Sequence, residues 1–231
     1  MLTLDSLHLS AGSFHLAADL TLEAGSRTAV IGPSGAGKST LLSAIAGFLP
    51  PTSGRVLWDG ADITRMEAGK RPLSILFQDQ NLFPHLTVAQ NIGLGISPAL
   101  RLSVGDHARI EESLIRTGLT GLGARKPDAL SGGQQSRVAL ARALLRKRPI
   151  LLLDEPFAAL GPALKAEMLT LVEEIATQER LTVLMVSHDP EDAVRLCPQT
   201  VLVAEGTAYP PQPTKELLAS PPPALRAYLG G

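Results

Sequence analysis

The fold is decided by one stretch of the sequence, Thr28-Ala29-Val30-Ile31-Gly32-Pro33-Ser34-Gly35-Ala36-Gly37-Lys38-Ser39-Thr40. Residues 28–31 form a short, mostly apolar run, which is typical of a parallel strand that is covered on both faces. The glycine-rich residues after this run indicate a tight loop. A helix is predicted after the loop, because apolar residues recur there at helical spacing, at Leu41, Leu42, Ile45 and Leu49. A strand, a loop and a helix in this order favour an α/β fold with a parallel sheet.

Residues 32–39 fit the pattern G-x-x-x-x-G-K-S/T, in which small residues let the backbone wrap around a phosphate chain. The inward N–H groups of such a loop and the N-terminus of the helix that follows both favour anions. We expect Lys38 to reach the β- and γ-phosphates and the Ser39 hydroxyl to bind Mg²⁺. A glycine-rich turn that binds nothing is the alternative. The predicted phosphate-binding residues are Gly32, Pro33, Ser34, Gly35, Ala36, Gly37, Lys38, Ser39 and Thr40.

Polar side chains follow three more predicted strands. These strands are the apolar runs at residues 74–77, 150–153 and 182–186. Gln78 follows the first run, and Asp154 and Glu155 follow the second. His188 lies just beyond the third. Because ligands of open parallel sheets bind beyond the carboxyl ends of the strands, we expect these side chains to surround one phosphate group and its metal ion.

Each of these four residues has a predicted role. Asp154 is expected to hold the metal ion together with Ser39 and Gln78. Glu155 could polarise the attacking water as a general base, and Gln78 can reach both the metal ion and this water. His188 could donate a hydrogen bond to a γ-phosphate oxygen, where charge accumulates during phosphoryl transfer. The alternatives are a helix cap or an ion pair for the two carboxylates and a structural role for Gln78 and His188. The predicted catalytic residues are Lys38, Gln78, Glu155 and His188.

The remaining regions complete the predicted organisation. Apolar and polar residues alternate over residues 14–22, as in an antiparallel edge sheet with one buried face. Residues 83–130 are helix- and loop-like and are interpreted as an inserted helical lobe. Further helices are predicted after Ser131 and over residues 164–175. The proline-rich residues 209–224 are expected to form an extended chain on the surface.

Composition narrows the class of protein. The chain has 231 residues, of which 45% are hydrophobic and 19% are charged, as is typical of a packed globular protein. Its net charge of −1 argues against nucleic acid as a primary partner, because proteins that bind a phosphate backbone usually carry an excess of basic residues. The single cysteine, Cys197, excludes an internal disulfide and is interpreted as a small apolar residue. The sequence shows neither an export signal nor an apolar run of membrane-spanning length, so we expect a cytoplasmic protein.

A fifth motif, Leu130-Ser131-Gly132-Gly133-Gln134, precedes a helical run that reaches about residue 146. Ser131 and Gln134 have the S-x-x-Q spacing of a capping box. Gly132 and Gly133 fall in the first turn, where each glycine costs roughly 1 kcal/mol relative to alanine. This cost is explained if a bulky anion must approach the N–H groups closely. We therefore predict a second anion site at Ser131, Gly132, Gly133 and Gln134, with a well-capped helix as the alternative.

In this order the five motifs resemble those of the ATP-binding cassette ATPases, and the resemblance covers residues 2–206. It implies an α/β fold, with a P-loop NTPase core built on a mostly parallel sheet, an N-terminal antiparallel β subdomain and an inserted α-helical subdomain. A single ATP-binding domain would span residues 1–231, with its core at about 1–82 and 146–231 and its helical subdomain at about 83–145. The resemblance also implies ATP and Mg²⁺ as cofactors.

The same resemblance implies a homodimer that sandwiches two ATP molecules head to tail. Ser131, Gly132 and Gly133 of one chain would contact the γ-phosphate that Lys38 of the other chain binds. Two features depart from the family pattern. Gly161 stands where the family usually has an aspartate, which implies weaker coupling between the two sites. The usual adenine-stacking tyrosine is missing from residues 10–15, and Phe14 falls on the predicted buried face, so adenine stacking is not expected.

Two more segments, Arg71-Pro72 and residues 77–88, look like those of bacterial importer cassettes. Such ATPases are partners of membrane permease subunits and, through them, of a periplasmic solute-binding protein. Their place is the cytoplasmic face of the inner membrane. Residues 88–95 and 163–172 are similar to the cassettes of importers for thiamine or thiamine diphosphate. Importers of iron, polyamines or molybdate are the alternatives.

Three other functions remain open from the sequence. A soluble ATP-dependent clamp on DNA or ribosomes would use the same motifs, but such proteins usually carry coiled-coil insertions or two cassettes. A small-molecule kinase would share residues 32–39 and would have no use for residues 130–134. A binding-only scaffold subunit is favoured by Gly161 and by the missing tyrosine, and it is opposed by the presence of Lys38, Glu155 and His188.

Overall fold

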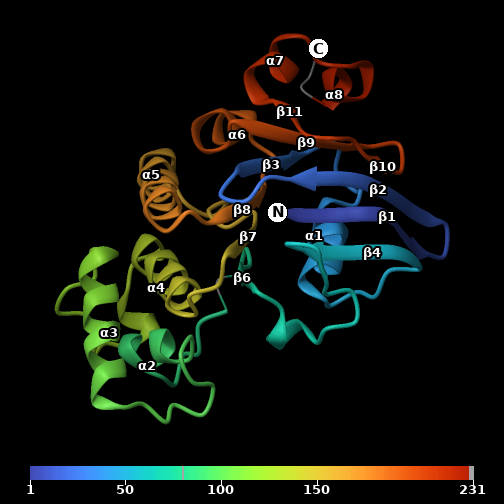
Figure 1. Cartoon of the computed structure of the whole chain (residues 1–231). Helices are drawn as coiled ribbons and strands as arrows, with labels where there is room; N and C mark the ends of the chain where they lie inside the picture. Colours follow the sequence, from blue (N-terminus) through green and yellow to red (C-terminus); the bar gives the residue numbers. More distant parts are fainter. Residues whose placement is uncertain (80, 229–231) are drawn as a thin grey trace.

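Five parallel strands form the centre of the structure, a computed structural model that describes residues 1–79 and 81–228 (Figure 1). Their order across the sheet is β9 (Gln199–Ala204), β3 (Arg27–Ile31), β8 (Thr182–Val186), β7 (Ile150–Asp154) and β6 (Leu73–Leu76). The four predicted strands match β3, β6, β7 and β8 to within one residue. β9 is an additional strand that the sequence analysis did not predict. The parallel centre of the predicted fold is confirmed.

Antiparallel strands continue this sheet. They are β1 (Leu2–Ala11), β2 (Phe14–Leu22), β4 (Ser53–Trp58) and β5 (Ala61–Asp62). Leu2 lies opposite Trp58 in the pairing of β1 with β4. β10 (Thr207–Ala208) joins the two parts of the sheet, because it pairs with β2 on one side and with β9 on the other. The alternation predicted for residues 14–22 is confirmed by the buried residues of β2, which are Leu16, Ala18, Leu20 and Leu22.

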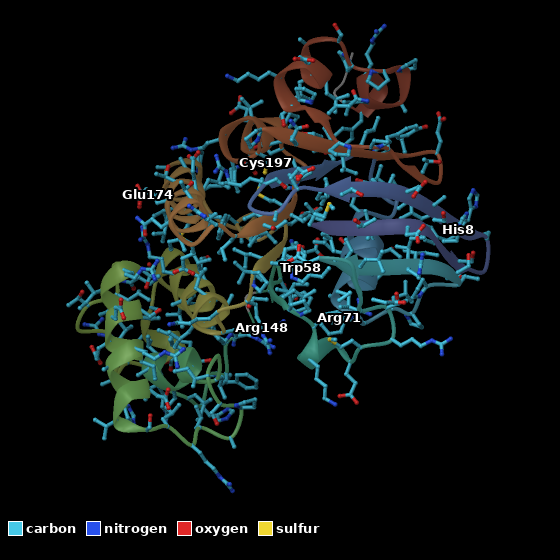
Figure 2. The ribbon with its side chains drawn as sticks, viewed as in Figure 1. His8, Trp58, Arg71, Arg148, Glu174 and Cys197 are labelled. Carbon is cyan, nitrogen blue, oxygen red and sulfur yellow. The ribbon has the colours of Figure 1, made fainter. Side chains whose placement is uncertain are left out.

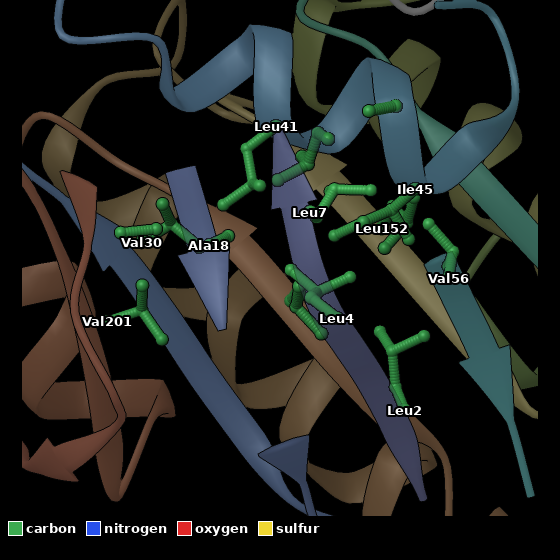
Figure 3. Packing of buried hydrophobic residues seen from close by; sticks show 14 of the residues in the cluster. Leu2, Leu4, Leu7, Ala18, Val30, Leu41, Ile45, Val56, Leu152 and Val201 are labelled. Carbon is green, nitrogen blue, oxygen red and sulfur yellow. The ribbon is translucent and has the colours of Figure 1, made fainter. Parts of the chain in front are cut away.

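Helices cover both faces of the parallel strands. They are α1 (Lys38–Ala46) on one face and α5 (Pro162–Glu179) and α6 (Pro190–Leu196) on the other. Val30 and Leu152 point into a first hydrophobic core with α1 and β1 (Figure 3). Their neighbours Ala29 and Leu151 point into a second core with α5 and α6. The parallel strands are therefore buried at successive positions, which explains the continuous apolar runs in the sequence.

A third hydrophobic cluster is built by helices. These are α2 (Val88–Gly93), α3 (Val104–Arg116) and α4 (Gly132–Leu145), and the 3-10 helix η2 (Pro127–Ala129) precedes α4. A second 3-10 helix, η1 (Ala68–Lys70), lies just before β6. Figure 1 shows α2, α3 and α4 grouped away from β1 and β2. Ile92, Leu114 and Val138 are buried in this cluster, whereas Ala139 of α4 packs in the second core. α4 therefore connects the helices to the sheet. Among the residues that the structure describes, none of the helices has the length and apolar character needed to cross a bilayer.

The prediction of an extended chain over residues 209–224 is wrong. This segment contains β11 (Gln212–Pro213) and α7 (Thr214–Ala219), and α8 (Pro223–Tyr228) begins within it. Pro213 caps α7 and Pro223 is the first residue of α8, positions at which a missing N–H group breaks no helical hydrogen bond. Leu217 is buried against the second core, so packing stabilises α7 despite its short length.

Arg71 is a buried charged side chain beside the C-terminal end of α1 (Figure 2). Its guanidinium group donates to the carbonyl oxygens of Ala44 at 2.8 Å and Ile45 at 2.7 Å. It also donates to the carbonyl oxygens of Thr64 at 2.6 Å and Met66 at 3.1 Å. The last carbonyl groups of a helix lack partners within the helix. Arg71 therefore caps α1 and ties it to the chain that leads into β6.

We predict that Arg71→Leu lowers the free energy of unfolding by about 3 kcal/mol, because several buried carbonyl oxygens lose their charged donor. Arg71→Lys should restore only part of the loss, since an ammonium group lacks the planar fork of donors. Urea denaturation followed by circular dichroism measures the change. Arg65→Leu, at an exposed position nearby, is the matched control. Equal stabilities of the Arg71→Leu and Arg65→Leu variants would contradict the prediction.

Candidate functional site

The loop between β3 and α1 begins with a backbone approach that only glycine permits. Gly32 has a φ of +151°, and a Cβ atom there would lie 1.9 Å from the carbonyl oxygen of Val203 on β9. At the other end of the loop, Gly37 has a φ of +103°, and a Cβ atom would lie 2.7 Å from the ring of Phe14. The half-buried Phe14 on β2 thus contacts the loop itself. β9 and β2 together fix the course of residues 32–39.

Lys38 is the first residue of α1, and its side chain is buried. Its ammonium group donates to the carbonyl oxygens of Gly32 at 2.8 Å and Pro33 at 2.9 Å. Burial lowers the pKa of Lys38, while the charges of Glu155 and Asp154 raise it. The side chain therefore folds back into the predicted phosphate-binding loop, close to the two carboxylates at the end of β7, Asp154 and Glu155.

Two of the three predicted metal-binding residues are in contact. The Ser39 hydroxyl donates to Oδ1 of Asp154 at 2.9 Å. Burial raises the pKa of Asp154, and the hydrogen bond from Ser39 opposes this effect. A hydroxyl and a carboxylate at the end of a parallel strand are oxygen donors of the kind that Mg²⁺ prefers. The chemistry of this pair therefore fits the predicted metal ion.

Gln78, the third predicted metal-binding residue, stands apart from this pair. It lies two residues after β6, which runs parallel to β7 with Leu76 opposite Leu153. This register places Gln78 at the same edge of the sheet as Glu155. The Gln78 side chain is exposed. Within the described residues it forms no hydrogen bond with Ser39 or Asp154, so the structure brings it to the site without engaging it.

Glu155 and His188 are in direct contact. Nδ1 of His188 lies 3.2 Å from Oε2 of Glu155, and an ionised carboxylate can only accept, so the ring nitrogen is the donor. Glu155 has a φ of +45°, an uncommon conformation for a residue other than glycine. Its backbone N–H group donates to the carbonyl oxygen of Val186 at 3.1 Å. The ends of β7 and β8 therefore hold Glu155, the predicted base, against His188, which is predicted to donate a hydrogen bond to the γ-phosphate.

Residues 131–134 form the capping box that the sequence predicts. The backbone N–H group of Gln134 donates to the Ser131 hydroxyl at 3.3 Å, and that of Ser131 donates to Oε1 of Gln134 at 3.0 Å. Gly132 is exposed, whereas Gly133 is buried and a Cβ atom there would lie 3.4 Å from Leu164. This distance is an ordinary van der Waals contact, so packing alone does not require a glycine at position 133. Across the described part of the chain, no hydrogen bond or ion pair joins residues 130–134 to residues 32–39.

Tyr228 contacts the site although no sequence motif predicts it, and Gly161 departs from the family pattern. Tyr228, at the end of α8, donates from its hydroxyl to the carbonyl oxygen of His188 at 2.6 Å. The packing of the C-terminal helices brings Tyr228 to the site. No local sequence motif signals this position. Gly161, where an aspartate was expected, precedes α5 as a cap without a side-chain hydrogen bond. A Cβ atom at Gly161 would have no neighbour within 4 Å, so the structure has room for a larger residue there.

Known proteins are similar in sequence to this chain along most or all of its length. A family model described as ABC transporter matches residues 17–158. The thiamine import ATP-binding protein ThiQ of Cereibacter sphaeroides is 68% identical over 230 residues, which cover 100% of both chains. The thiamine import ATP-binding protein ThiQ of Escherichia coli (strain K12) is 54% identical over 200 residues, which cover 87% of this chain and 86% of that protein.

Solved structures share its fold. CbiO1 from Clostridium perfringens, part of the CbiONQ ABC transporter complex, matches with a TM-score of 0.84 and 30% identity over 95% of this chain and 90% of that chain. A dimeric bacterial ABC transporter cassette matches with a TM-score of 0.79 and 29% identity over 93% and 99% of the two chains. A post-hydrolysis structure of that cassette, bound to ADP and Pi, has a TM-score of 0.78. Because the family model spans more than half of the sequence and a relative matches it from end to end, this chain belongs to the ABC transporter family.

Proposed function

We propose that this chain is the ATP-hydrolysing subunit of a bacterial importer and that the imported solute is thiamine or thiamine diphosphate. The contact between Glu155 and His188 at 3.2 Å, in the electrostatic field of Lys38, is the observation that supports hydrolysis most directly. Binding alone needs the loop and its lysine. A carboxylate that is held beside the γ-phosphate position is needed to accept a proton from water. The names of these relatives favour thiamine over iron, polyamines and molybdate.

The proposed reaction divides the work among these residues. The backbone N–H groups of residues 32–39 and the Lys38 ammonium group would bind the β- and γ-phosphates of ATP. Glu155 would accept the proton of the attacking water. A protonated His188 would donate from Nδ1 to Glu155 and from Nε2 to a γ-phosphate oxygen, which stabilises the charge of the transition state. Gln78, which is exposed at the same edge, would orient the water once the site is closed.

Mg²⁺ is the metal ion that we propose for this site. Ser39 and Asp154 would hold it, with Gln78 as the third protein group, because all three supply oxygen donors. When bound, the ion would neutralise charge on the β- and γ-phosphates. The raised pKa of Asp154 reflects burial beside Glu155, and a cation at this carboxylate would favour its ionised form.

We infer that two chains close on the nucleotide as a homodimer. Residues 130–134 make no polar contact with residues 32–39 of their own chain, yet they present the N-terminus of α4 with exposed Ser131 and Gly132. A solved cassette with the same fold is dimeric. A second chain would bring the backbone N–H groups at the N-terminus of its α4 to the γ-phosphate that Lys38 of the first chain binds. The division into a core at about 1–82 and 146–231 and a helical subdomain at about 83–145 is part of this proposal.

Glu155→Gln is predicted to slow ATP hydrolysis by at least about 100-fold while ATP binding is retained, because the amide can accept from His188 and cannot take a proton. Phosphate release measures the rate, and a sizing column with saturating ATP measures the dimer. Glu174→Gln, on the exposed side of α5 (Figure 2), is the matched control and should leave both unchanged. The homodimer is contradicted if the Glu155→Gln variant stays monomeric with ATP, both alone and with its permease.

A groove between the C-terminal ends of α1 and α4 offers a docking site for the permease. It has a volume of about 360 Å³ and is lined by Phe48, Phe77, Phe83 and Leu94. The rings of Phe48 and Phe77 lie 5.9 Å apart, and Phe48 and Phe83 are 55% and 46% exposed. Exposed phenylalanines around a hollow are typical of a surface that a partner covers. We propose that a helix of the permease binds here, which places the chain at the cytoplasmic face of the inner membrane.

Phe48→Ala combined with Phe83→Ala is predicted to reduce the co-purification of the permease by about tenfold or more, because aromatic anchors dominate such interfaces. ATP binding by the isolated double variant should equal that of the wild type. Val104→Ala removes a side chain that is 89% exposed on α3 and serves as the control. If the double variant co-purifies with the permease at the wild-type level, the proposal that the permease docks in this groove is contradicted.

Solute identity is tested on the assembled importer. The chain, its permease and its solute-binding protein are reconstituted in vesicles, and phosphate release is measured with thiamine, thiamine diphosphate, ferric iron, a polyamine or molybdate. Stimulation by thiamine or its diphosphate alone is the expected result. Stimulation by one of the other solutes, with thiamine inactive, would contradict the solute assignment and leave the ATPase assignment in place.

A further inference from the structure

The C-terminal helix α8 brings an aromatic side chain to the proposed nucleotide site. Leu225 of α8 is fully buried in the second core, and the helix packs on β9. Tyr228 then donates to the carbonyl oxygen of His188 at 2.6 Å. The centre of its ring lies 6.0 Å from Nζ of Lys38. Tyr228 therefore bridges two residues between which the γ-phosphate is proposed to bind.

The chain that leads to Tyr228 is attached to the sheet at several points. The Thr214 hydroxyl donates to the carbonyl oxygen of Cys197 and lies 2.9 Å from the Thr200 hydroxyl on β9. Leu217 is buried. The backbone N–H group of Arg226 donates to the carbonyl oxygen of Pro222 at 2.8 Å, which closes the turn of α8. Packing of the whole C-terminal segment thus determines where Tyr228 lies.

The ring of Tyr228 and a terminal phosphate compete for the same space. An ammonium group binds a phosphate oxygen at about 2.8 Å, and the phosphorus and the other oxygens lie beyond that atom. A phosphate group between Lys38 and His188 would therefore reach the ring, whose centre is 6.0 Å from Nζ of Lys38. In the structure the Lys38 ammonium group binds the carbonyl oxygens of Gly32 and Pro33 and faces the ring. Attraction between a cation and an aromatic ring favours this arrangement.

The hydroxyl of Tyr228 is a dependable donor in this position. Burial raises the pKa of Tyr228, and the negative charges of Glu155 and Asp189 raise it further. The phenol therefore stays protonated at neutral pH and can donate to the His188 carbonyl oxygen. The hydrogen bond to His188, which contacts the proposed base Glu155, places the phenol beside the proposed hydrolysis site.

We propose that Tyr228 occupies the position of the γ-phosphate in the nucleotide-free chain and that α8 is a strap which ATP displaces. This inference rests on the proposed function, because it takes residues 32–39 as the nucleotide site. ADP has no γ-phosphate, so α8 can keep its place when ADP is bound. The strap therefore lowers the affinity for ATP relative to ADP, and its return after phosphate release restores the nucleotide-free arrangement.

Calorimetric titration of the full chain with Mg²⁺ and either ADP or the non-hydrolysable analogue AMP-PNP tests the strap. Tyr228→Ala should raise the affinity for AMP-PNP about tenfold, since the analogue no longer has to break a hydrogen bond and a cation–ring contact. The affinity for ADP should change less than twofold. Tyr228→Phe keeps the ring and should give a smaller rise. Tyr209→Ala, which removes the other tyrosine of the chain, is the matched control and should change neither affinity.

The outcomes separate the strap from the proposed function. A wild-type chain that binds neither nucleotide would overturn the proposed function itself. A chain that binds both, with a ratio of affinities that Tyr228→Ala leaves unchanged, would overturn the strap alone. A lower affinity of this variant for AMP-PNP would also overturn it, because Tyr228 would then assist binding.

A direct measurement of displacement complements these affinities. Tyr209→Phe leaves Tyr228 as the single tyrosine, which can be replaced by 3-fluorotyrosine and observed by fluorine NMR. AMP-PNP should shift the fluorine signal to that of a solvent-exposed ring, and ADP should leave it in place. The same shift with both nucleotides, or with neither, would overturn the displacement by the γ-phosphate.

Discussion

The backbone of Gly32 lies so close to β9 that any side chain would overlap the carbonyl oxygen of Val203. This contact determines where β3 ends and how the chain turns into α1. β9 is itself held by β3, β10 and β11, so the position of the loop depends on the whole sheet. Lys38 begins the helix with its ammonium group folded back onto Gly32. The geometry that receives phosphate is therefore a property of the packed sheet as much as of the glycine-rich sequence.

One cation, Lys38, lies close to two carboxylates, Asp154 and Glu155, at the end of the sheet. Burial lowers the pKa of Lys38 and raises that of Asp154, and the attraction between the two charges opposes both shifts without cancelling them. Glu155 adds a second negative charge and is in hydrogen-bond contact with His188. A triphosphate would bring several more negative charges to this point. The arrangement thus gives a physical reason for a divalent cation and for the N-terminus of a helix from a second chain, both of which the proposed mechanism uses.

Most of the fold and of the candidate site could be predicted from local patterns in the sequence. Continuous apolar runs predicted β3, β6, β7 and β8 because these strands are covered on both faces, and the S-x-x-Q spacing predicted the capping box of α4. Glu155 and His188 follow the carboxyl ends of parallel strands, so they were predicted to lie close together, and they are in contact. The C-terminal helices were missed because prolines were interpreted as breaks, although they start these helices. Tyr228 could not be predicted, since its contact with His188 joins residues 40 positions apart through the packing of α7 and α8.

Trp58 pairs with Leu2 at the border of the first core and is the single tryptophan of the chain. The cluster of α2, α3 and α4 is built from aliphatic side chains. Intrinsic fluorescence therefore reports on the melting of the antiparallel strands and is silent when the helical cluster opens. Far-ultraviolet ellipticity, in contrast, is dominated by helices. A fluorescence midpoint at higher temperature than the ellipticity midpoint would reveal two cooperative units within one polypeptide.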